Sequence, residues 1–225
     1  MKTWADFLFY YYTSLRYPEK LPNNIQWLFP QAEVSVQDII KKFYKKFYND
    51  QEQRTLCLGI NPGRFGAGVT GVNFTAPKQL LQNCGIEHNL RSQSEISAEF
   101  IYAVIEQYGG PELFYKNFFI GSVCPLGFVQ HDKNINYYDD KDLLKTVEPF
   151  IIESIRQLAD YRVNHEYCVC IGGEKNFRYL SNLNEKYNWF NKVIPLPHPR
   201  FIMQYKRKSL REYIDQYLQV LSEVS

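Results

Sequence analysis

The sequence predicts an α/β fold: a three-layer α/β/α arrangement around a central, mostly parallel, four-stranded sheet. Four short apolar runs each stop at a loop containing Gly, Pro, Asn, His or Ser, as buried strands do. Helical stretches separate these runs, and strands that alternate with helices form parallel sheets covered on both faces. The length of 225 residues suits one domain over residues 1–225, with an N-terminal helical extension at about 1–50.

The first two elements are expected to be helices. Residues 3–15 are predicted to form an aromatic-rich helix with Thr3 as its N-cap. Ser35 is expected to cap a second helix, whose lysines lie on one face. The opposite face of this helix is apolar and indicates packing against a core; it carries Ile39, Ile40, Phe43 and Phe47.

The alternation of strands and helices begins at about residue 54. The expected strands are 55–60, 118–123, 167–171 and 192–196, and the expected helices are 77–84, 97–107, 140–159, 174–184 and 209–224. Pro149 should break or restart the helix over 140–159, because proline removes a backbone N–H donor. Ligands of parallel sheets bind beyond the carboxyl ends of the strands, so the loops after the four strands are the expected place for chemistry.

Composition narrows the class of protein. Hydrophobic residues make up 45% of the chain and charged residues 22%, and no apolar run approaches the roughly 20 residues that span a bilayer. The N-terminus lacks the pattern of a signal peptide. The five cysteines include no C-x-x-C pair and fall mostly in strand-like runs, which indicates buried thiols in the cytoplasm rather than an iron–sulfur cluster. The net charge of +2 neither demands nor excludes a polyanionic partner.

The loop over residues 59–74 is rich in glycine and follows the first predicted core strand, which indicates a ligand site rather than an inert connection. Residues 66–71 satisfy the G-x-G-x-x-G pattern of dinucleotide-binding loops. That pattern should begin at the strand end and open directly into a helix, whereas residues 61–65 and 72–76 intervene here. We therefore interpret the match as coincidental. A Walker A loop fails because Gly-Lys-Ser/Thr is absent.

Three motifs, taken in order, resemble those of a known family. G-x-N-P-G-x-F-G at residues 59–66, followed by T-G-V-x-F at 70–74, resembles the first motif of the single-strand-selective monofunctional uracil-DNA glycosylases. Cys-Pro-Leu at 124–126 and His-Pro at 198–199 follow the later strands. The resemblance spans about residues 54–215. It implies a divergent, bacterial-type branch of the uracil-DNA glycosylase superfamily, with that superfamily's fold and with no metal or cofactor.

The resemblance implies two catalytic residues. Asn61 matches the residue that holds the attacking water. An amide cannot act as a general base near neutral pH, so Asn61 would orient the water and stabilise charge. It could also cap the turn before Pro62. His198 matches the catalytic histidine, which would stabilise negative charge on the departing base.

The resemblance also implies a pocket for a base flipped out of DNA. Phe74 would be the platform beneath the base, Gly63 would offer backbone groups to it, and Phe65 would form a wall. Ser122 stands where the family has an Asn that reads the uracil edge. A hydroxyl is shorter than an amide and cannot make the same bidentate contact. Ser122 therefore predicts a roomier pocket that accepts modified uracils, such as 5-hydroxymethyluracil, and even xanthine.

Residues from 198 onward are expected to contact DNA. The family pattern His-Pro-Ser-Pro-Arg is replaced here, and the residues that could wedge into the base stack are Arg200, Phe201, Ile202 and Met203. A basic cluster follows and would neutralise phosphates beside the flipped base. A charge run can also be a solvated helix face. The cluster comprises Arg200, Lys206, Arg207, Lys208 and Arg211.

These features predict a monomeric DNA-repair enzyme that binds DNA, flips out uracil and hydrolyses its N-glycosidic bond. No lysine falls in a matched motif, so water rather than an imine-forming amine is expected to attack the sugar, leaving an abasic site. Two alternatives stay open from sequence. A catalytically weak DNA- or nucleotide-binding module on the same fold would fit Ser122, and a nicotinamide oxidoreductase would need residues 66–71 to bind its cofactor.

Overall fold

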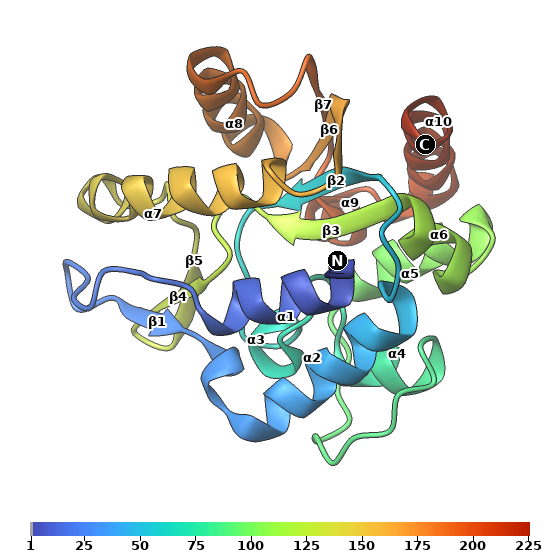
Figure 1. The fold of residues 1–225 in the computed structure, drawn as a ribbon, viewed down its shortest axis with the longest axis horizontal. Helices are drawn as coiled ribbons and strands as arrows, with labels where there is room; N and C mark the ends of the chain where they lie inside the picture. Colours follow the sequence, from blue (N-terminus) through green and yellow to red (C-terminus); the bar gives the residue numbers. More distant parts are fainter. Residues whose placement is uncertain (1) are drawn as a thin grey trace.

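The computed structural model describes residues 2–225 and confirms the predicted three-layer α/β/α fold (Figure 1). The central sheet is four-stranded, in the order β3-β2-β6-β7, and every pairing in it is parallel. Its members are the four predicted strands, with β6 beginning earlier than expected. Their bounds are β2 Arg54–Gly59, β3 Phe118–Ser122, β6 Val163–Ile171 and β7 Lys192–Leu196.

Helices cover both faces of this sheet. Figure 1 shows α5, α6 and α10 gathered on one side of the strands and α7 and α8 on the other. The helices predicted between the strands are all present, and α6 is an addition to them. Their bounds are α4 Pro77–Gln82, α5 Ile96–Tyr108, α6 Pro111–Asn117, α7 Lys141–Ala159, α8 Gly173–Tyr187 and α10 Leu210–Val224.

The two N-terminal helices are α1 (Trp4–Thr13) and α2 (Val34–Phe47). Thr3 caps α1 as predicted, in a reciprocal capping box with Asp6. The prediction that Ser35 caps α2 is wrong, because the helix already begins at Val34 with Glu33 as its N-cap. The 3₁₀ helix η1 (Pro30–Ala32) leads directly into Glu33, so the chain is already turning before the expected start.

Helix α7 corrects a second expectation, since Pro149 lies inside it without ending it. Proline removes the hydrogen bond to the carbonyl four residues earlier, which is that of Lys145. Both residues are exposed, so the freed carbonyl lies on the solvent side of the helix. The apolar residues of α7 face the core without interruption.

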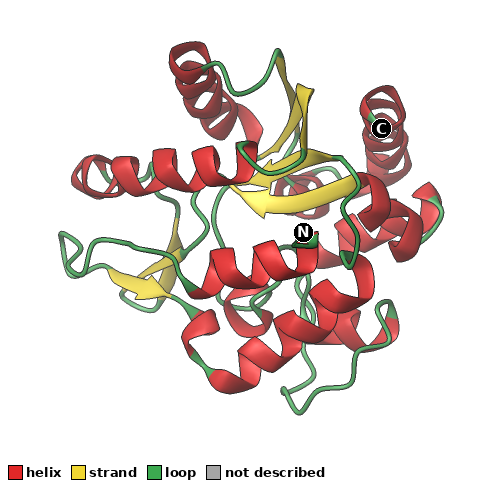
Figure 2. Ribbon diagram, viewed as in Figure 1, coloured by secondary structure: helices red, strands yellow, loops and turns green. Residues whose placement is uncertain are grey.

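A second, smaller sheet was not predicted. It is antiparallel, has the order β1-β4-β5, and is drawn apart from the central sheet in Figure 2. The glycine-rich loop contains a single helical turn, α3, and the segment after β7 forms a helix, α9, followed by a 3₁₀ turn, η2. The bounds are β1 Gln26–Leu28, β4 Gly127–Gln130, β5 Lys133–Ile135, α3 Ala67–Thr70, α9 Pro199–Tyr205 and η2 Arg207–Ser209.

Helix α1 is part of the core of the molecule. Its Trp4 is fully buried, and the indole Nε1–H donates to the Glu52 carbonyl at 2.7 Å. Next to Trp4 lies Arg54, whose buried guanidinium donates to both carboxylate oxygens of Asp50 at 2.7 Å. The guanidinium carbon is 5.5 Å from the centre of the Trp4 ring. A buried cation with a full set of partners therefore joins α1 to the start of β2.

The five cysteines are free and buried, in agreement with the prediction of reduced thiols. Over residues 2–225, no helix combines the length and hydropathy needed to cross a bilayer. Within the same described part of the chain, no three His, Cys, Asp or Glu side chains are grouped as a metal site would require.

Candidate active site

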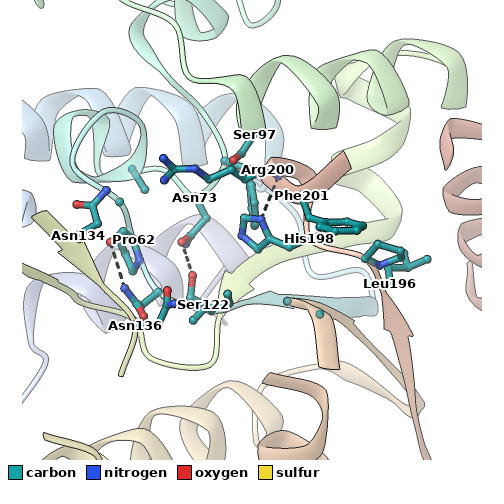
Figure 3. Close-up of a pocket in the computed structure, with 18 of the residues that line it drawn as sticks. Pro62, Asn73, Ser97, Ser122, Asn134, Asn136, Leu196, His198, Arg200 and Phe201 are labelled. Atoms are coloured by element: carbon teal, nitrogen blue, oxygen red, sulfur yellow. Dashed lines mark hydrogen bonds between the residues drawn. The ribbon is translucent and has the colours of Figure 1, made fainter. Parts of the chain in front are cut away.

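A pocket of about 830 Å³ lies at the carboxyl ends of all four strands of the central sheet, where the sequence placed the chemistry (Figure 3). The predicted site residues that line it are Asn61, Gly63, Phe74, Ser122, His198, Arg200 and Phe201. Those that do not line it are Phe65, Lys206, Arg207 and Lys208. Asn61 and His198 follow strands at different positions in the sheet, so the fold brings together two residues 137 positions apart (198 − 61).

The Asn61 amide is held in one orientation by the end of β5 and the segment that follows it. Its Oδ1 accepts from the backbone N–H of Tyr137 at 3.1 Å, and its Nδ2 donates to the Ile135 carbonyl at 3.3 Å. A weaker contact of 3.4 Å runs from Nδ2 to the Pro62 carbonyl. Because a carbonyl oxygen has two lone pairs, Oδ1 keeps one acceptor position beyond the bond to Tyr137.

The small antiparallel sheet fixes the loop around Asn61. Asn134 of β5 lines the pocket, and its Oδ1 accepts from the backbone N–H of Arg64 at 3.1 Å. A Cβ at Gly63 would lie 3.3 Å from the Asn134 Nδ2, so a glycine permits this close approach. Residues of a sheet that the sequence did not reveal therefore hold the loop that the sequence singled out.

Phe74 has a backbone conformation that is rare for an aromatic residue. Its φ is 50°, in the left-handed region that favours glycine, and such strain is concentrated at functional sites. The ring lies against the end of β2, because a Cβ on Gly59 would be only 2.7 Å from the Phe74 Cε2 atom. The centres of the Phe74 and His198 rings are 5.9 Å apart. The backbone thus aims a flat apolar surface into the pocket beside the histidine.

Phe65, expected as a wall, is 52% exposed and lies outside the residues that line the pocket. The Arg64 guanidinium stands over its ring, with the guanidinium carbon 5.1 Å from the ring centre. The structure therefore places Phe65 on the outer surface of the loop.

His198 is the N-cap residue of α9, and its Nδ1 accepts from the backbone N–H of Arg200 at 3.0 Å. The acceptor role of Nδ1 places the ring proton of the neutral imidazole on Nε2. Burial, reinforced by the positive charge of Arg200, lowers the pKa of His198 from 6.5 to about 4. The side chain is therefore a neutral hydrogen-bond donor at physiological pH.

Ser122 does not stand alone in the pocket. Its Oγ donates to Oδ1 of Asn73 at 2.7 Å, and Nδ2 of Asn73 donates to the Tyr12 hydroxyl at 2.9 Å. Figure 3 shows the Asn73 and Ser122 side chains joined by this bond. Sequence reasoning missed Asn73, although it lies inside the T-G-V-x-F motif as the variable residue. It also missed Tyr12, which nothing in the sequence connects with residue 73.

The mouth of the pocket combines one acid with aromatic and cationic groups. Glu95 lines it, and burial raises the pKa of this carboxyl, opposed by the positive charge of Arg200. Phe201 and Tyr205 are exposed on α9, with their ring centres 5.7 Å apart. Ile202, one of the four wedge candidates, is fully buried and points into the core.

Comparison with known proteins identifies a matching family and a similar solved structure. The family model described as UDG, uracil DNA glycosylase superfamily, matches residues 45–222. The crystal structure of wild-type Pedobacter heparinus SMUG2 is similar over its whole length, with a TM-score of 0.95 and 42% sequence identity. The match covers 99% of this chain and 98% of that chain.

Proposed function

The chain belongs to the uracil DNA glycosylase superfamily and is a monofunctional uracil-DNA glycosylase, and on this premise we propose that Asn61 and His198 are its catalytic residues. The observation that carries the proposal is that these two side chains line one pocket together with the ring of Phe74. A base inside a duplex hides its glycosidic bond, so the target nucleotide must be extruded before it can enter that pocket.

In the proposed complex the extruded base lies on Phe74. The ring is aimed into the pocket by a strained backbone before any ligand binds, and Gly59 lets it sit directly at the strand end. A pocket formed in advance lowers the entropy that binding has to overcome. Backbone groups around Gly63 complete the contacts to the base.

His198 is proposed to stabilise the leaving group. As the bond from the sugar carbon C1′ to the base nitrogen breaks, its electron pair goes to the base, and negative charge builds on the base oxygen. The Nε2–H of a neutral imidazole can donate to that oxygen, and such a donor needs no proton transfer in the transition state. Because Nδ1 is already occupied by the Arg200 N–H, the ring is held in the tautomer that this role requires.

Asn61 is proposed to place the water that attacks C1′. Its Oδ1 retains an acceptor position, which suits a water hydrogen. The water oxygen forms the new bond to C1′ of an oxocarbenium-like sugar, one water proton passes to solvent or to the released base, and the product is an abasic site. An amide suffices for this role only if bond breaking runs ahead of water attack, because an amide cannot take up the proton.

The substrate range is proposed to include 5-hydroxymethyluracil and xanthine as well as uracil. The support is the pocket volume of about 830 Å³ together with the short side chain of Ser122 at the base edge. Excision should be measured on uracil, 5-hydroxymethyluracil, xanthine and cytosine in matched oligonucleotides. We expect release of the first three bases, and cleavage of uracil alone would contradict the wider range.

The reaction itself is tested by alkali cleavage. A single-stranded oligonucleotide with one uracil is incubated with the purified protein and then heated in alkali, which breaks the strand at an abasic site. We expect cleavage at the uracil position, with the same rate in the presence of a chelator. An intact strand after a long incubation would contradict glycosylase activity and would favour the alternative of a catalytically weak DNA-binding module.

DNA is the partner of the enzyme, and we propose that Arg200 and Phe201 meet it at the mouth of the pocket while Lys206, Arg207 and Lys208 contact phosphates. The support is that the three residues 206–208 are exposed on the turn next to α9. We further propose that the enzyme acts as a monomer in the bacterial cytosol, in keeping with its five unpaired thiols.

A further inference from the structure

A chain of buried hydrogen bonds runs from the N-terminal helix α1 into the pocket. The Tyr12 hydroxyl accepts from Nδ2 of Asn73 at 2.9 Å, and Oδ1 of Asn73 accepts from Ser122 at 2.7 Å. All three side chains are buried, with exposed fractions of 1%, 6% and 4% for Tyr12, Asn73 and Ser122. Tyr12 lies outside residues 45–222, the segment that matches the family.

The Asn73 amide has hydrogen-bonding capacity left over. A primary amide offers two N–H donors and two acceptor lone pairs, and these two bonds use one donor and one lone pair. Asn73 and Ser122 both line the pocket, whereas Tyr12 does not. Tyr12 therefore holds the amide from behind, and one N–H and one lone pair remain for a molecule in the pocket.

The backbone that carries Asn73 is also fixed. The Thr75 hydroxyl donates to the Asn73 carbonyl at 3.1 Å, and the Thr70 hydroxyl donates to the Thr75 carbonyl at 2.6 Å. The next residue is Phe74, with its left-handed backbone. One rigid turn thus presents a ring and an amide side by side, as a site needs in order to bind the face and the edge of one flat ligand.

We propose that Asn73 is the residue that reads the edge of the extruded base, and that Tyr12 positions it; this rests on the function proposed above. Uracil offers a donor at N3–H beside an acceptor at O4, and xanthine offers the same pair at N1–H and O6. The free lone pair and the free N–H of Asn73 complement this pair. Cytosine presents the reverse order, with an acceptor at N3 and a donor at its amino group.

The amide that the family carries at position 122 is thereby replaced by one from position 73. Ser122 becomes a support whose hydroxyl orients Oδ1, rather than a direct reader of the base. The base edge is then recognised by an amide placed by α1, which gives the N-terminal helix a part in specificity. Edge recognition of this kind fits a pyrimidine and a purine that share the same donor and acceptor pattern.

The test compares uracil with N3-methyluracil in single-stranded oligonucleotides, because the methyl group replaces the N3–H donor with a bulkier apolar group and leaves O2, O4 and the glycosidic bond in place. The measured quantity is the ratio of single-turnover excision rates for the two bases. A site that leaves a buried amide group unpaired against N3-methyluracil should favour uracil by up to about a hundredfold. Asn73→Ala should lower uracil excision about ten- to a hundredfold and leave N3-methyluracil excision nearly unchanged. A ratio that stays at the wild-type value in this variant would overturn the proposal.

Tyr12→Phe provides a second test that keeps the ring and removes only the hydroxyl. We expect the ratio to fall by about three- to tenfold, as expected for one hydrogen bond. Tyr11→Phe is the matched control: Tyr11 is the neighbouring residue, and its buried hydroxyl contacts the Ser154 carbonyl at 3.4 Å, away from the pocket. It should leave the ratio unchanged. An equal shift of the ratio in both variants would contradict the positioning role of Tyr12.

The proposed function and the role of the Tyr12–Asn73 pair can be contradicted separately. No excision of uracil by the wild-type protein would contradict the proposed function. Rapid excision by the wild-type protein, with the same base ratio in Tyr12→Phe and Asn73→Ala, would contradict only the role of the Tyr12–Asn73 pair. If Asn73→Ala does not fold, the comparison of Tyr12→Phe with Tyr11→Phe decides the question by itself.

Discussion

The glycine-rich loop after β2 and the α9–η2 segment border the same pocket, and they are held in very different ways. In the loop, the side chains of Asn61 and Asn73 each make hydrogen bonds to neighbouring groups, and Phe74 is pinned against Gly59. In α9–η2, residues 204–208 are exposed, and no hydrogen bond or ion pair within residues 2–225 engages the side chains of Lys206 and Lys208.

This difference separates two tasks. The loop is organised before substrate arrives, which suits groups that must stabilise a transition state. The exposed cations of α9–η2 have no comparable partners within the described part of the folded chain, which suits the proposed phosphate contacts that would supply affinity and salt dependence. His198 belongs to both regions, since it starts α9 and faces the loop. Changes in the loop should therefore alter the rate of excision, and changes in α9–η2 should alter binding.

The largest effect is expected from His198→Ala or Asn61→Ala. Each removes a group that we propose to act on the reacting bond, so single-turnover excision of uracil should fall about a hundred- to a thousandfold. Affinity for the oligonucleotide, followed by fluorescence anisotropy, should change little. A variant that excises at the wild-type rate would remove that residue from the catalytic site.

The pH profile of excision tests the role of His198, because its imidazole must be neutral to donate from Nε2 while Nδ1 accepts. With a pKa lowered to about 4, the imidazole stays neutral down to pH 5, so excision at pH 5 should remain close to that at pH 7.5. If the histidine had its ordinary pKa of about 6.5, the excision rate would fall about thirtyfold between pH 7.5 and pH 5. In the unfolded chain this histidine takes up its proton first, so the stability of the folded state should decline as pH falls from 6.5 toward 4.

The control for this profile is Glu95→Gln, because Glu95 is the acid in the pocket mouth and its pKa is raised. If a loss of activity at acidic pH disappears in that variant, the titrating group is Glu95. If the loss persists, the interpretation of His198 as a neutral donor is wrong.

Gly59→Ala should disturb the loop without touching a catalytic group. The added Cβ would lie 2.7 Å from the Phe74 ring, a distance that forces the ring to move. A displaced platform should reduce excision about ten- to a hundredfold, with DNA affinity largely kept. A double-mutant cycle provides the check: Gly59→Ala should have no further effect in a Phe74→Ala background, and additive losses would show that Gly59 acts by another route.

The smallest effect on rate is expected in α9–η2. The double variant Lys206→Ser, Lys208→Ser should weaken binding to single-stranded DNA. The slope of log affinity against log salt should become shallower by about 0.7 for each phosphate that the variant no longer neutralises. Excision at saturating protein should be nearly unchanged. Lys145→Ser, an exposed lysine on α7, is the matched control. Equal salt slopes for all three proteins would contradict phosphate binding by residues 206 and 208.

The sequence predicted the central sheet well, because buried parallel strands read as short apolar runs that end at glycine, proline or asparagine. It could not reveal the small sheet, whose strands are three or four residues long and partly exposed. Helix α9 was missed for a different reason. His-Pro at its start resembles a turn, but proline at the first helical position and a capping His198 are also compatible with a helix.

The sequence predicted the part of the candidate site that is formed by the three family-like motifs. Asn61 and His198 follow strand ends closely and Phe74 closes the glycine-rich loop, so their positions in the fold follow from the sequence pattern. Asn73 and Tyr12 were beyond reach, since their contact depends on how α1 packs against the sheet, and no local pattern encodes that packing. Ser122 lines the pocket as predicted, but its hydrogen-bond partner Asn73 was not foreseen.

The burial of α1 has a practical consequence for anyone who trims the protein. The family match begins at residue 45, yet Trp4 packs on the guanidinium of Arg54 and on the ring of Phe119, and its indole nitrogen is tied to the Glu52 carbonyl. A fragment cut at the edge of the recognised segment would uncover aromatic surface and leave a buried cation half solvated. Domain boundaries drawn from the family match alone would, in this molecule, pass through its interior.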